Sequence, residues 1–277
     1  MLMAVGAFAL MDALMKLLAD TYAPMQVSFL RGITSLPFLL LPVVLRGRLA
    51  RLKPVNIPLH LFRGVLAVVM LGSFIYAVRE SSLTVTYSVF MFAPLLVAAI
   101  AGPMLGERVT RVQWIALAFG LLGVILMLRP DPGEWVSLGA LAAFVAAVCY
   151  AFAAATLRLL ARSDTTESMA VSFVLLLSIG SGILAAADWR VIQAEHWPLL
   201  LGLGLTGALG QYFITEAFRQ APASVIAPFE YTALIWGVAL DFAIWGLLPE
   251  LTTLMGGLVI VAAGLYLIAR ERRGRAP

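Results

Sequence analysis

Long apolar runs dominate the sequence, and their length restricts what the chain can fold into. A helix that crosses a bilayer needs about 20 mostly apolar residues, because the hydrocarbon core is roughly 30 Å thick and each residue rises about 1.5 Å. Ten runs meet this requirement, at residues 1–18, 24–45, 58–78, 82–104, 110–128, 136–157, 168–187, 197–218, 221–247 and 250–269. The runs are continuously apolar and do not alternate, so we predict an all-α membrane protein with ten transmembrane helices and not a β-barrel.

The composition agrees with a membrane protein. Hydrophobic residues make up 62% of the 277 and charged residues only 12%, whereas soluble domains are near a quarter charged. The single cysteine, Cys149, excludes an internal disulfide, and two histidines, His60 and His196, are too few for a metal cluster. We therefore expect no metal site and no cofactor. The first run contains Asp12 and Lys16 and lacks a basic leader, so it is not interpreted as a signal peptide.

The distribution of Lys and Arg predicts the orientation, because these residues resist translocation across the membrane. If the N-terminus is cytoplasmic, thirteen of the nineteen Lys and Arg residues fall on the cytoplasmic side: Arg46, Arg48, Arg51, Lys53, Arg108, Arg111, Arg158, Arg162, Arg219, Arg270, Arg272, Arg273 and Arg275. Both termini are therefore predicted to be cytoplasmic. Anionic headgroups account for the basic tail, so the net charge of +4 requires no nucleic-acid partner.

An internal repeat is visible at a spacing near 140 residues. "YAVRESSLTVTYSVFMFAPL" (76–95) and "EAFRQAPASVIAPFEYTALI" (216–235) share four residues in this register, and "MQVSF" (25–29) parallels "MAVSF" (169–173). Each half would hold five spans, and an odd number means that the second copy enters the membrane from the opposite side. Inverted repeats with a site at their interface are typical of secondary transporters that work by alternating access.

Residues 79–130, "RESSLTVTYSVFMFAPLLVAAIAGPMLGERVTRVQWIALAFGLLGVILMLRP", resemble the first half-repeat of the EamA-type branch of the drug/metabolite transporter superfamily. The landmarks are Pro94, the pair Gly106-Glu107 and Gly123. The second half carries "RQAPASVIAPFEYTALIWG" and "PELTTLMGGLVIVAAGLYL" in the matching places, although "LLP" separates Gly246 from Glu250.

The resemblance implies two inverted five-helix repeats, residues 1–130 and 135–270, followed by a basic cytoplasmic tail at 271–277. It also implies a central cavity lined mainly by spans 3, 4, 8 and 9, in a protein of the bacterial inner membrane. The implied activity is export of small metabolites, with amino acids favoured and aromatic or apolar ones first among them. Carriers of S-adenosylmethionine, riboflavin or nucleotide-like metabolites are the alternative within the same branch.

Polar residues inside the spans are candidates for function, because a charge at the bilayer centre costs about 3 kcal/mol or more. Glu230 lies nine residues past Ala221, about 13 Å into the membrane core. A carboxyl group at this depth can carry a proton or bind the ammonium group of a substrate, and a structural hydrogen bond to a neighbouring helix is the alternative. Gln211, well inside span 8, is predicted to face the cavity.

Three further charged residues are candidates for gating. Asp241 lies eleven residues after Glu230 on nearly the same helix face, where it is either a hydrated interfacial carboxylate or an outer gate. Asp12 and Arg31 lie nine residues before and nine after the turn at Thr21 and Tyr22, so they are at similar depth. Hairpin geometry allows them to pair, as a structural ion pair or as a gate.

Aromatic residues gather on the predicted cavity helices, where they suit a planar or apolar substrate. Each one taken alone could equally be packing or lipid-facing. The candidates for substrate contact are Tyr76, Tyr87, Phe90, Tyr212, Tyr231 and Trp236. Pro94 and Pro228 lie inside spans 4 and 9, where each removes a backbone hydrogen bond, and both are predicted hinges.

The sequence thus favours a secondary transporter and not an enzyme. An intramembrane enzyme is disfavoured because no Ser-His or His-Glu-x-x-His pattern occurs within a span, and a non-transporting scaffold leaves the inverted repeat and Glu230 unexplained. The predicted partners are a small-molecule substrate and the lipid bilayer, with protons as a candidate coupling ion. The protein is expected to be a monomer or a homodimer.

Overall fold

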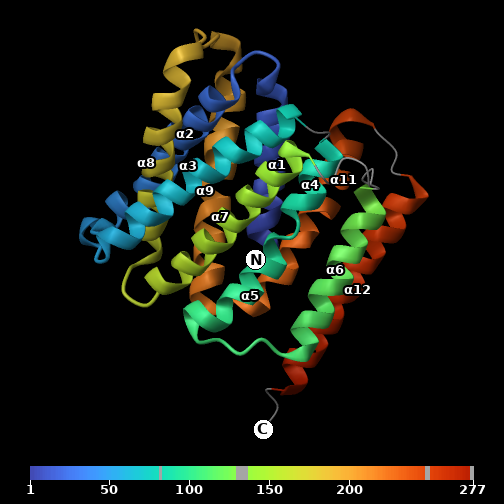
Figure 1. Cartoon of the computed structure of the whole chain (residues 1–277). Helices are drawn as coiled ribbons and strands as arrows, with labels where there is room; N and C mark the ends of the chain where they lie inside the picture. Colours follow the sequence, from blue (N-terminus) through green and yellow to red (C-terminus); the bar gives the residue numbers. More distant parts are fainter. Residues whose placement is uncertain (81–82, 129–136, 247–249, 275–277) are drawn as a thin grey trace. The chain divides into compact units, whose positions relative to one another are not determined.

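The computed structural model describes residues 1–80, 83–128, 137–246 and 250–274, which form helices joined by short connections and contain no strand (Figure 1). The longer helices are α1 (Leu2–Ala19), α2 (Pro24–Leu45), α3 (Ile57–Glu80), α4 (Leu83–Phe90), α5 (Ala93–Leu105), α6 (Arg111–Leu128), α7 (Leu138–Leu160), α8 (Thr166–Ala185), α9 (Trp197–Gln220), α11 (Thr232–Trp245) and α12 (Leu251–Gly274). The shorter elements are η1 (Leu49–Leu52), η3 (Ala186–Asp188), η4 (Ala194–His196), α10 (Ala223–Ile226) and η5 (Ala227–Tyr231).

The predicted spans correspond closely to these helices. Among the described residues, nine helical stretches are long and apolar enough to cross a membrane, and α6 supplies a shorter apolar stretch at residues 111–126. Two of the nine are interrupted within their length: one runs through α4 and α5, and another through α10, η5 and α11. Two others include a short 3₁₀ turn at one end, η3 after α8 and η4 before α9. The prediction of an all-α membrane protein is therefore confirmed.

Contacts between residues divide the chain into two compact units. Unit 1 comprises residues 1–68 and 156–220, and unit 2 comprises residues 69–155 and 221–277. Two of the three boundaries fall inside α3 and α7, and the third follows the last residue of α9. Each unit therefore draws on both halves of the sequence, so the units divide the chain differently from the predicted repeats.

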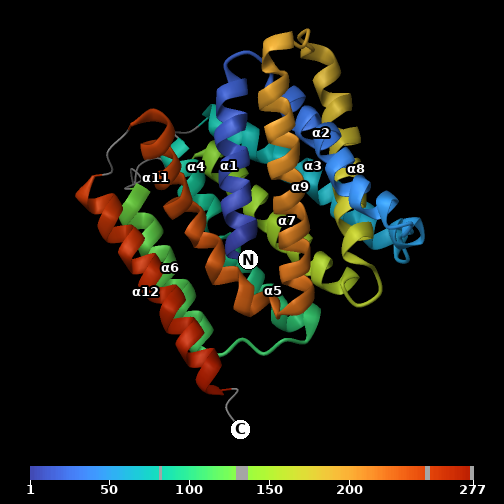
Figure 2. The ribbon, with the colours of Figure 1, turned by 180° about the vertical axis from the view of Figure 1, so that it is seen from behind.

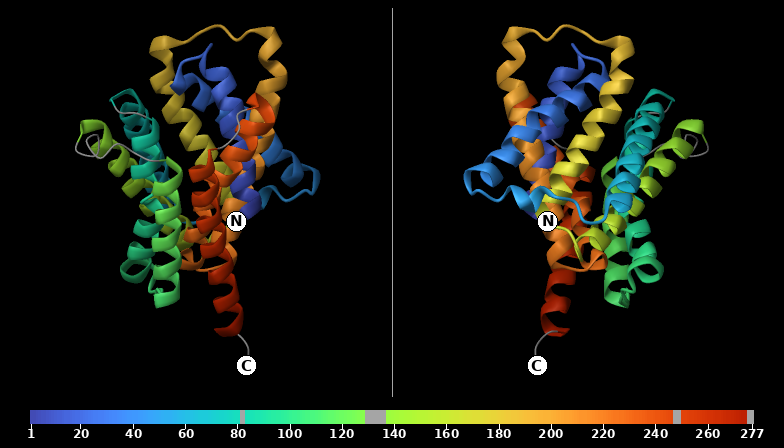
Figure 3. Two further views of the ribbon diagram at one scale, coloured as in Figure 1. Left: turned by 90° about the vertical axis from the view of Figure 1, so that its right-hand side faces the viewer. Right: turned by 90° about the vertical axis from the view of Figure 1, so that its left-hand side faces the viewer.

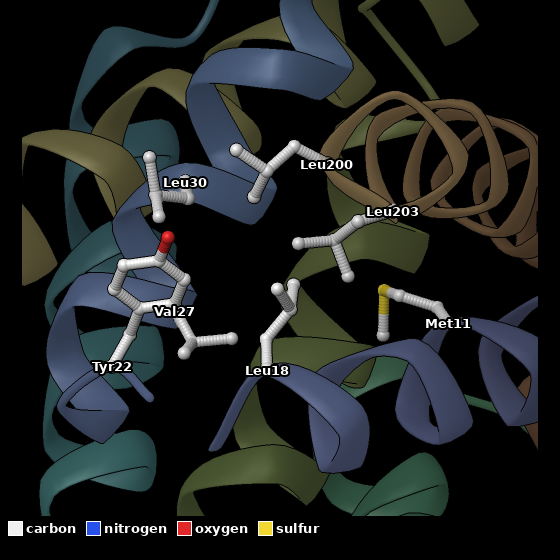
Figure 4. Close-up of a cluster of buried hydrophobic side chains, with 7 residues drawn as sticks. All are labelled: Met11, Leu18, Tyr22, Val27, Leu30, Leu200 and Leu203. Atoms are coloured by element: carbon white, nitrogen blue, oxygen red, sulfur yellow. The ribbon is translucent and has the colours of Figure 1, made fainter. Parts of the chain in front are cut away.

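Unit 1 has a core built by α1, α2 and α9. Figure 4 shows seven buried side chains of this core turned toward one another: Met11, Leu18, Tyr22, Val27, Leu30, Leu200 and Leu203. Pro24 stands in the first turn of α2, where its missing N–H costs no helical hydrogen bond. The hairpin of α1 and α2 thereby starts at a fixed place and packs on α9 (Figure 2).

The connection from α8 to α9 arches over the α1–α2 turn (Figure 3). Two side chains of the hairpin hold it there. The Gln26 amide donates to the Arg190 carbonyl (2.6 Å) and accepts from the Arg190 N–H (2.9 Å). The Tyr22 hydroxyl oxygen accepts from the Gln193 N–H (2.9 Å) and lies 2.8 Å from His196 Nδ1. These bonds satisfy backbone groups that a loop at the end of a helix would otherwise expose.

Glycines allow α9 to approach α2 closely. A Cβ atom added to Gly204 would collide with the backbone carbonyl of Thr34, and one added to Gly207 would lie 2.6 Å from Ser35 Oγ. The Thr34 backbone at Gly204 cannot move aside, whereas the Ser35 side chain at Gly207 has some freedom to do so. These glycines therefore serve packing, as small residues commonly do between membrane helices.

In unit 2, α6 and α12 lie side by side over much of their length (Figures 1 and 2). A Cβ on Gly123 would lie 2.7 Å from the carbonyl oxygen of Gly256, so this glycine is needed for their contact. Gly264, the counterpart of Gly123 in the second half of the sequence, has open space around its Cβ position. The two positions match in sequence but differ in packing.

We predict that Gly204→Ala destabilises the protein, because the new methyl group meets backbone. Overpacking costs about 1 to 3 kcal/mol, which outweighs a gain of up to about 1 kcal/mol from the helix propensity of alanine. The control is Gly237→Ala in α11, where nothing lies within 4 Å of the added Cβ. Thermal unfolding in detergent should show a lower midpoint for the first variant and an unchanged or higher one for the second. Equal midpoints would contradict the close approach.

Candidate substrate-binding site

Two membrane spans of unit 2 are interrupted near their middle. The fourth predicted span breaks at residues 91–92, between α4 and α5, and the ninth passes from α10 through the 3₁₀ turn η5 into α11. Displaced by 140 residues, the 227–231 turn maps onto 87–91, so the breaks nearly coincide in the repeat. Non-helical backbone at membrane depth is tolerated only where protein covers it or where it lines a cavity, and paired broken helices commonly form transporter binding sites.

Proline accounts for both interruptions. Pro94 would need to donate a helical hydrogen bond to the Phe90 carbonyl, but it has no N–H and its ring clashes with that carbonyl. α4 accordingly ends at Phe90, and Pro94 stands in the first turn of α5. Pro228 similarly lies at the start of η5. The structure thus places both prolines at breaks, and their role as hinges in transport stays a prediction.

Equivalent glycines end the two broken spans. Gly106 (φ +72°) follows α5 and Gly246 (φ +68°) follows α11, 140 residues apart, and both adopt the left-handed conformation that favours glycine. Glu107 then accepts a hydrogen bond from the Ser224 N–H in α10 (3.4 Å). The Gly106-Glu107 pair thus ends one broken span and contacts the start of the other, against which α5 packs.

Glu230 lies in η5, at the break of the ninth span, and is half-buried. Its Oε1 atom accepts a hydrogen bond from the Tyr150 hydroxyl on α7 (2.9 Å). No other hydrogen bond to this carboxylate is made among the described residues. One carboxylate oxygen is therefore fixed by the protein, and the other is available to a ligand.

A series of aromatic rings leads to Tyr150 through edge-to-face contacts. The ring centroids of Tyr87 and Phe74 are 5.5 Å apart, those of Phe74 and Phe90 are 5.3 Å apart, and those of Phe90 and Tyr150 are 5.8 Å apart. Such pairs contribute about 0.5–1.5 kcal/mol each beyond their area of contact. The candidate site is thus a carboxylate at the end of four rings in edge-to-face contact, drawn from α3, α4 and α7.

Tyr231 follows Glu230 but points into the protein. Its side chain is 0% exposed, and its ring packs on Gly120 of α6 so closely that a Cβ there would collide with it. Within the described ranges its hydroxyl has no hydrogen-bond partner. A buried hydroxyl without a partner is costly, so it marks a position where a ligand or water would be stabilised.

The other predicted contact residues are distributed over both units. In unit 2, Tyr76 and Trp236 are exposed. The side chain of Asp241, which was predicted as a gate and not as a contact residue, lies outside the described part of the structure. In unit 1, Gln211 is buried and donates to Thr215 on its own helix (3.3 Å). Tyr212, also in unit 1, is exposed and contacts Phe213. The structure therefore brings Tyr87, Phe90 and Glu230 into one connected group.

Asp12 and Arg31 lie on α1 and α2 of unit 1 and attract each other electrostatically. The Arg31 guanidinium also lies 5.7 Å from the centroid of the Phe8 ring, a cation–π distance. This placement agrees with the hairpin geometry expected from the sequence. A gating role for the pair stays a prediction.

An apolar hollow of about 630 Å³ opens beside the break of the fourth span, lined by Val89, Phe92, Ser137, Leu138, Ala140, Leu141 and Phe144. It contains no charged group and does not include Glu230. A specific binding site needs a few polar groups to orient its ligand. We therefore place the candidate site at Glu230 and not in this hollow.

A buried polar cluster in unit 1 was missed by the sequence analysis. His60 Nε2 lies 2.9 Å from Asp164 Oδ1 and must donate to it, since a carboxylate only accepts, while Ser172 Oγ lies 2.6 Å from His60 Nδ1. Ser172 Oγ is also 2.6 Å from the Ser168 carbonyl of its own helix. His60 is 104 residues from Asp164 and 112 from Ser172 in the sequence, so no local pattern could predict the cluster.

Asp164 lies in the connection between α7 and α8, outside the spans. Burial alone would raise the pKa of its carboxyl group, but hydrogen bonds from Ser163, His60 and the Val55 N–H hold that pKa below its usual value. The carboxylate thus ties the start of α3 to the α7–α8 connection. Linking these two segments is a structural role, and it explains the cluster without assigning it a catalytic one.

The described residues contain no group of three or more His, Cys, Asp or Glu placed to hold a metal ion. Apolar helical spans, two of them interrupted and one with a carboxylate at its break, define a multi-pass helical membrane protein with a feature typical of transporters. Residues 1–129 and 137–270 match the EamA-like transporter family, and the chain belongs to this family.

The relatives whose activities are named are transporters and not enzymes. The chain is 26% identical to the pseudopaline exporter CntI of Pseudomonas aeruginosa (strain UCBPP-PA14), over 96% of this chain and 93% of that one. It is 27% identical to the riboflavin transporter of Vibrio cholerae (77% and 72% covered) and 25% identical to the S-adenosylmethionine uptake transporter of Rickettsia conorii (95% and 88%). A crystal structure with 18% identity has the same fold, with a TM-score of 0.81 over 99% of both chains. The protein is therefore a transporter of small metabolites.

We predict that Tyr231→Phe and Tyr150→Phe change stability in opposite directions. The first removes a buried hydroxyl without a partner and should raise the free energy of unfolding by about 1 kcal/mol. The second removes a hydrogen bond to Glu230 and should lower it by about 1–2 kcal/mol. Thermal unfolding of ligand-free protein in detergent measures both. If Tyr231→Phe destabilises as much as Tyr150→Phe, its hydroxyl is already satisfied, for instance by bound water.

We predict that Asp164→Ala costs about 3 kcal/mol, because three donors lose their acceptor. Since the pKa of Asp164 is lower in the folded protein, its stabilisation is fully present above the unfolded value of about 3.9 and is lost as pH falls through the folded value. The difference in unfolding midpoint between wild type and variant should be constant from about pH 5 to 8 and shrink below about pH 4. Asp20→Ala, at an exposed aspartate of unit 1, is the control and should change little.

Proposed function

We propose that the protein is a secondary transporter that exports small metabolites across a bacterial inner membrane by alternating access. In this mechanism the binding site opens to one side of the membrane and then to the other. Glu230 at the break of the ninth span is the observation that carries the proposal, since an ionisable group at membrane depth is retained when function requires it. We further propose that both termini are cytoplasmic, in accord with the distribution of Lys and Arg.

The proposed substrates are amino acids or related amines with an aromatic or apolar part. The edge-to-face rings from Tyr87 to Tyr150 offer an apolar surface, and Glu230 offers one charged group for orientation. The names of the relatives support a wider range, including riboflavin and S-adenosylmethionine, as the alternative. Two matches to the same family in one chain support two repeats of five helices.

The test of transport is counterflow in proteoliposomes loaded with one unlabelled metabolite at a time. The panel comprises aromatic and aliphatic amino acids, S-adenosylmethionine, riboflavin and purines. Accumulation of the labelled compound without chemical change is the expected result for one class. Failure of the entire panel with folded protein would argue against these substrates.

We predict that Glu230→Gln reduces counterflow at least roughly tenfold and flattens its pH dependence. The amide keeps the size of the side chain, but it cannot carry a negative charge or exchange a proton, and hydrogen bonds to charged groups are the stronger ones. The matched control is Glu195→Gln, an exposed glutamate in the α8–α9 connection, which should transport as wild type. Wild-type activity with an unchanged pH profile in Glu230→Gln would exclude a direct role.

A further inference from the structure

Apart from α3, which supplies Phe74 and ends with Arg79 and Glu80, the segments that form the candidate site carry an unbalanced charge. Residues 83–105, 138–155 and 221–246 contain no Lys, Arg or His, and their acidic residues are Glu230 and Asp241. α4, α5 and the part of α7 in unit 2 therefore bring no basic side chain toward Glu230. A substrate carboxylate would find no cation on these segments, whereas a substrate cation would find Glu230.

The aromatic rings near Glu230 also favour a substrate with a positive charge. Phe74, Phe90 and Tyr150 are each half-buried, so part of each ring remains accessible. The face of an aromatic ring is electrostatically negative and attracts ammonium, sulfonium and guanidinium groups. The carboxylate and the rings thus both favour a positively charged substrate.

Tyr150 sets the geometry of the carboxylate. Its hydroxyl donates to Oε1 of Glu230 (2.9 Å) and its ring contacts Phe90 (5.8 Å). The phenol therefore holds the carboxylate at the edge of the aromatic series and leaves Oε2 without a hydrogen bond among the described residues. A cation bound at Oε2 would lie close to the rings that receive its apolar part.

From these observations we infer that the site selects organic cations: a protonated amine, sulfonium or quaternary ammonium group attached to an aromatic or apolar body. The inference rests on the proposed function and narrows it. Glu230 pairs with the cationic centre, Tyr150 orients the carboxylate, and Phe90 and Phe74 contact the apolar body. Among the substrates considered above, it favours amines and S-adenosylmethionine over riboflavin.

The test compares four compounds that share a phenyl ring and differ in charge. These are 2-phenylethylamine (cation), phenylalanine (zwitterion), 2-phenylethanol (neutral) and 3-phenylpropionate (anion). Binding to the purified full chain in detergent is measured by titration calorimetry. We expect 2-phenylethylamine to bind at least roughly tenfold more tightly than 2-phenylethanol, and 3-phenylpropionate to bind most weakly.

Two variants show whether Glu230 causes the preference. Glu230→Gln should bring the affinities of 2-phenylethylamine and 2-phenylethanol within about twofold of each other, while Glu195→Gln should leave their ratio as in wild type. Equal affinities in wild type, a ratio unchanged in Glu230→Gln, or no binding of any of the four would overturn the inference. If the inference fails in this way, counterflow of a neutral or anionic metabolite by the same preparation would show that the protein is a transporter with a different substrate preference.

Discussion

The backbone hydrogen bond is the interaction on which this structure depends. In lipid, each unsatisfied N–H or C=O costs several kcal/mol, because no water replaces the lost partner. The chain meets this requirement by being helical along nearly every apolar run. The α-helix is interrupted next to prolines, by a turn at residues 91–92 and by the 3₁₀ helix η5 at 227–231. The N–H groups of Met91 and Phe92 still donate to backbone carbonyls, and η5 packs against α5, α6 and α12 of unit 2. The interruptions of the α-helix are therefore found where the residues of the candidate binding site lie.

The sequence was sufficient for the spans and for local geometry. Length and hydropathy predicted the helices, Pro94 and Pro228 predicted where two of them are interrupted, and the short α1–α2 turn predicted that Asp12 and Arg31 lie at similar depth. Each of these rests on residues close together in the chain. Physical rules for a single helix or hairpin were therefore enough.

Pairings between distant helices could not be predicted in this way. Tyr150 and Glu230 are 80 residues apart, and His60 and Asp164 are 104 apart. One tyrosine among many in apolar helices carries no signal of its partner, because the choice depends on how α7 packs in three dimensions. The same holds for glycines: Gly123 and Gly264 match in the repeat, but packing against α12 makes a side chain intolerable at the first position alone.

Two matches to one family model imply corresponding positions in the two halves of the chain, and a site that binds one substrate specifically needs different side chains at such positions. In the 140-residue register Phe90 corresponds to Glu230, one apolar and one ionisable. Tyr150 contacts both, with its ring against Phe90 and its hydroxyl on the Glu230 carboxylate. An amphipathic tyrosine suits this position, since a phenylalanine there would leave the carboxylate without a donor and a polar aliphatic residue would lose the ring contact. The pair of broken helices thus has an apolar side and a charged side, which under the proposed function would orient a substrate that has one of each.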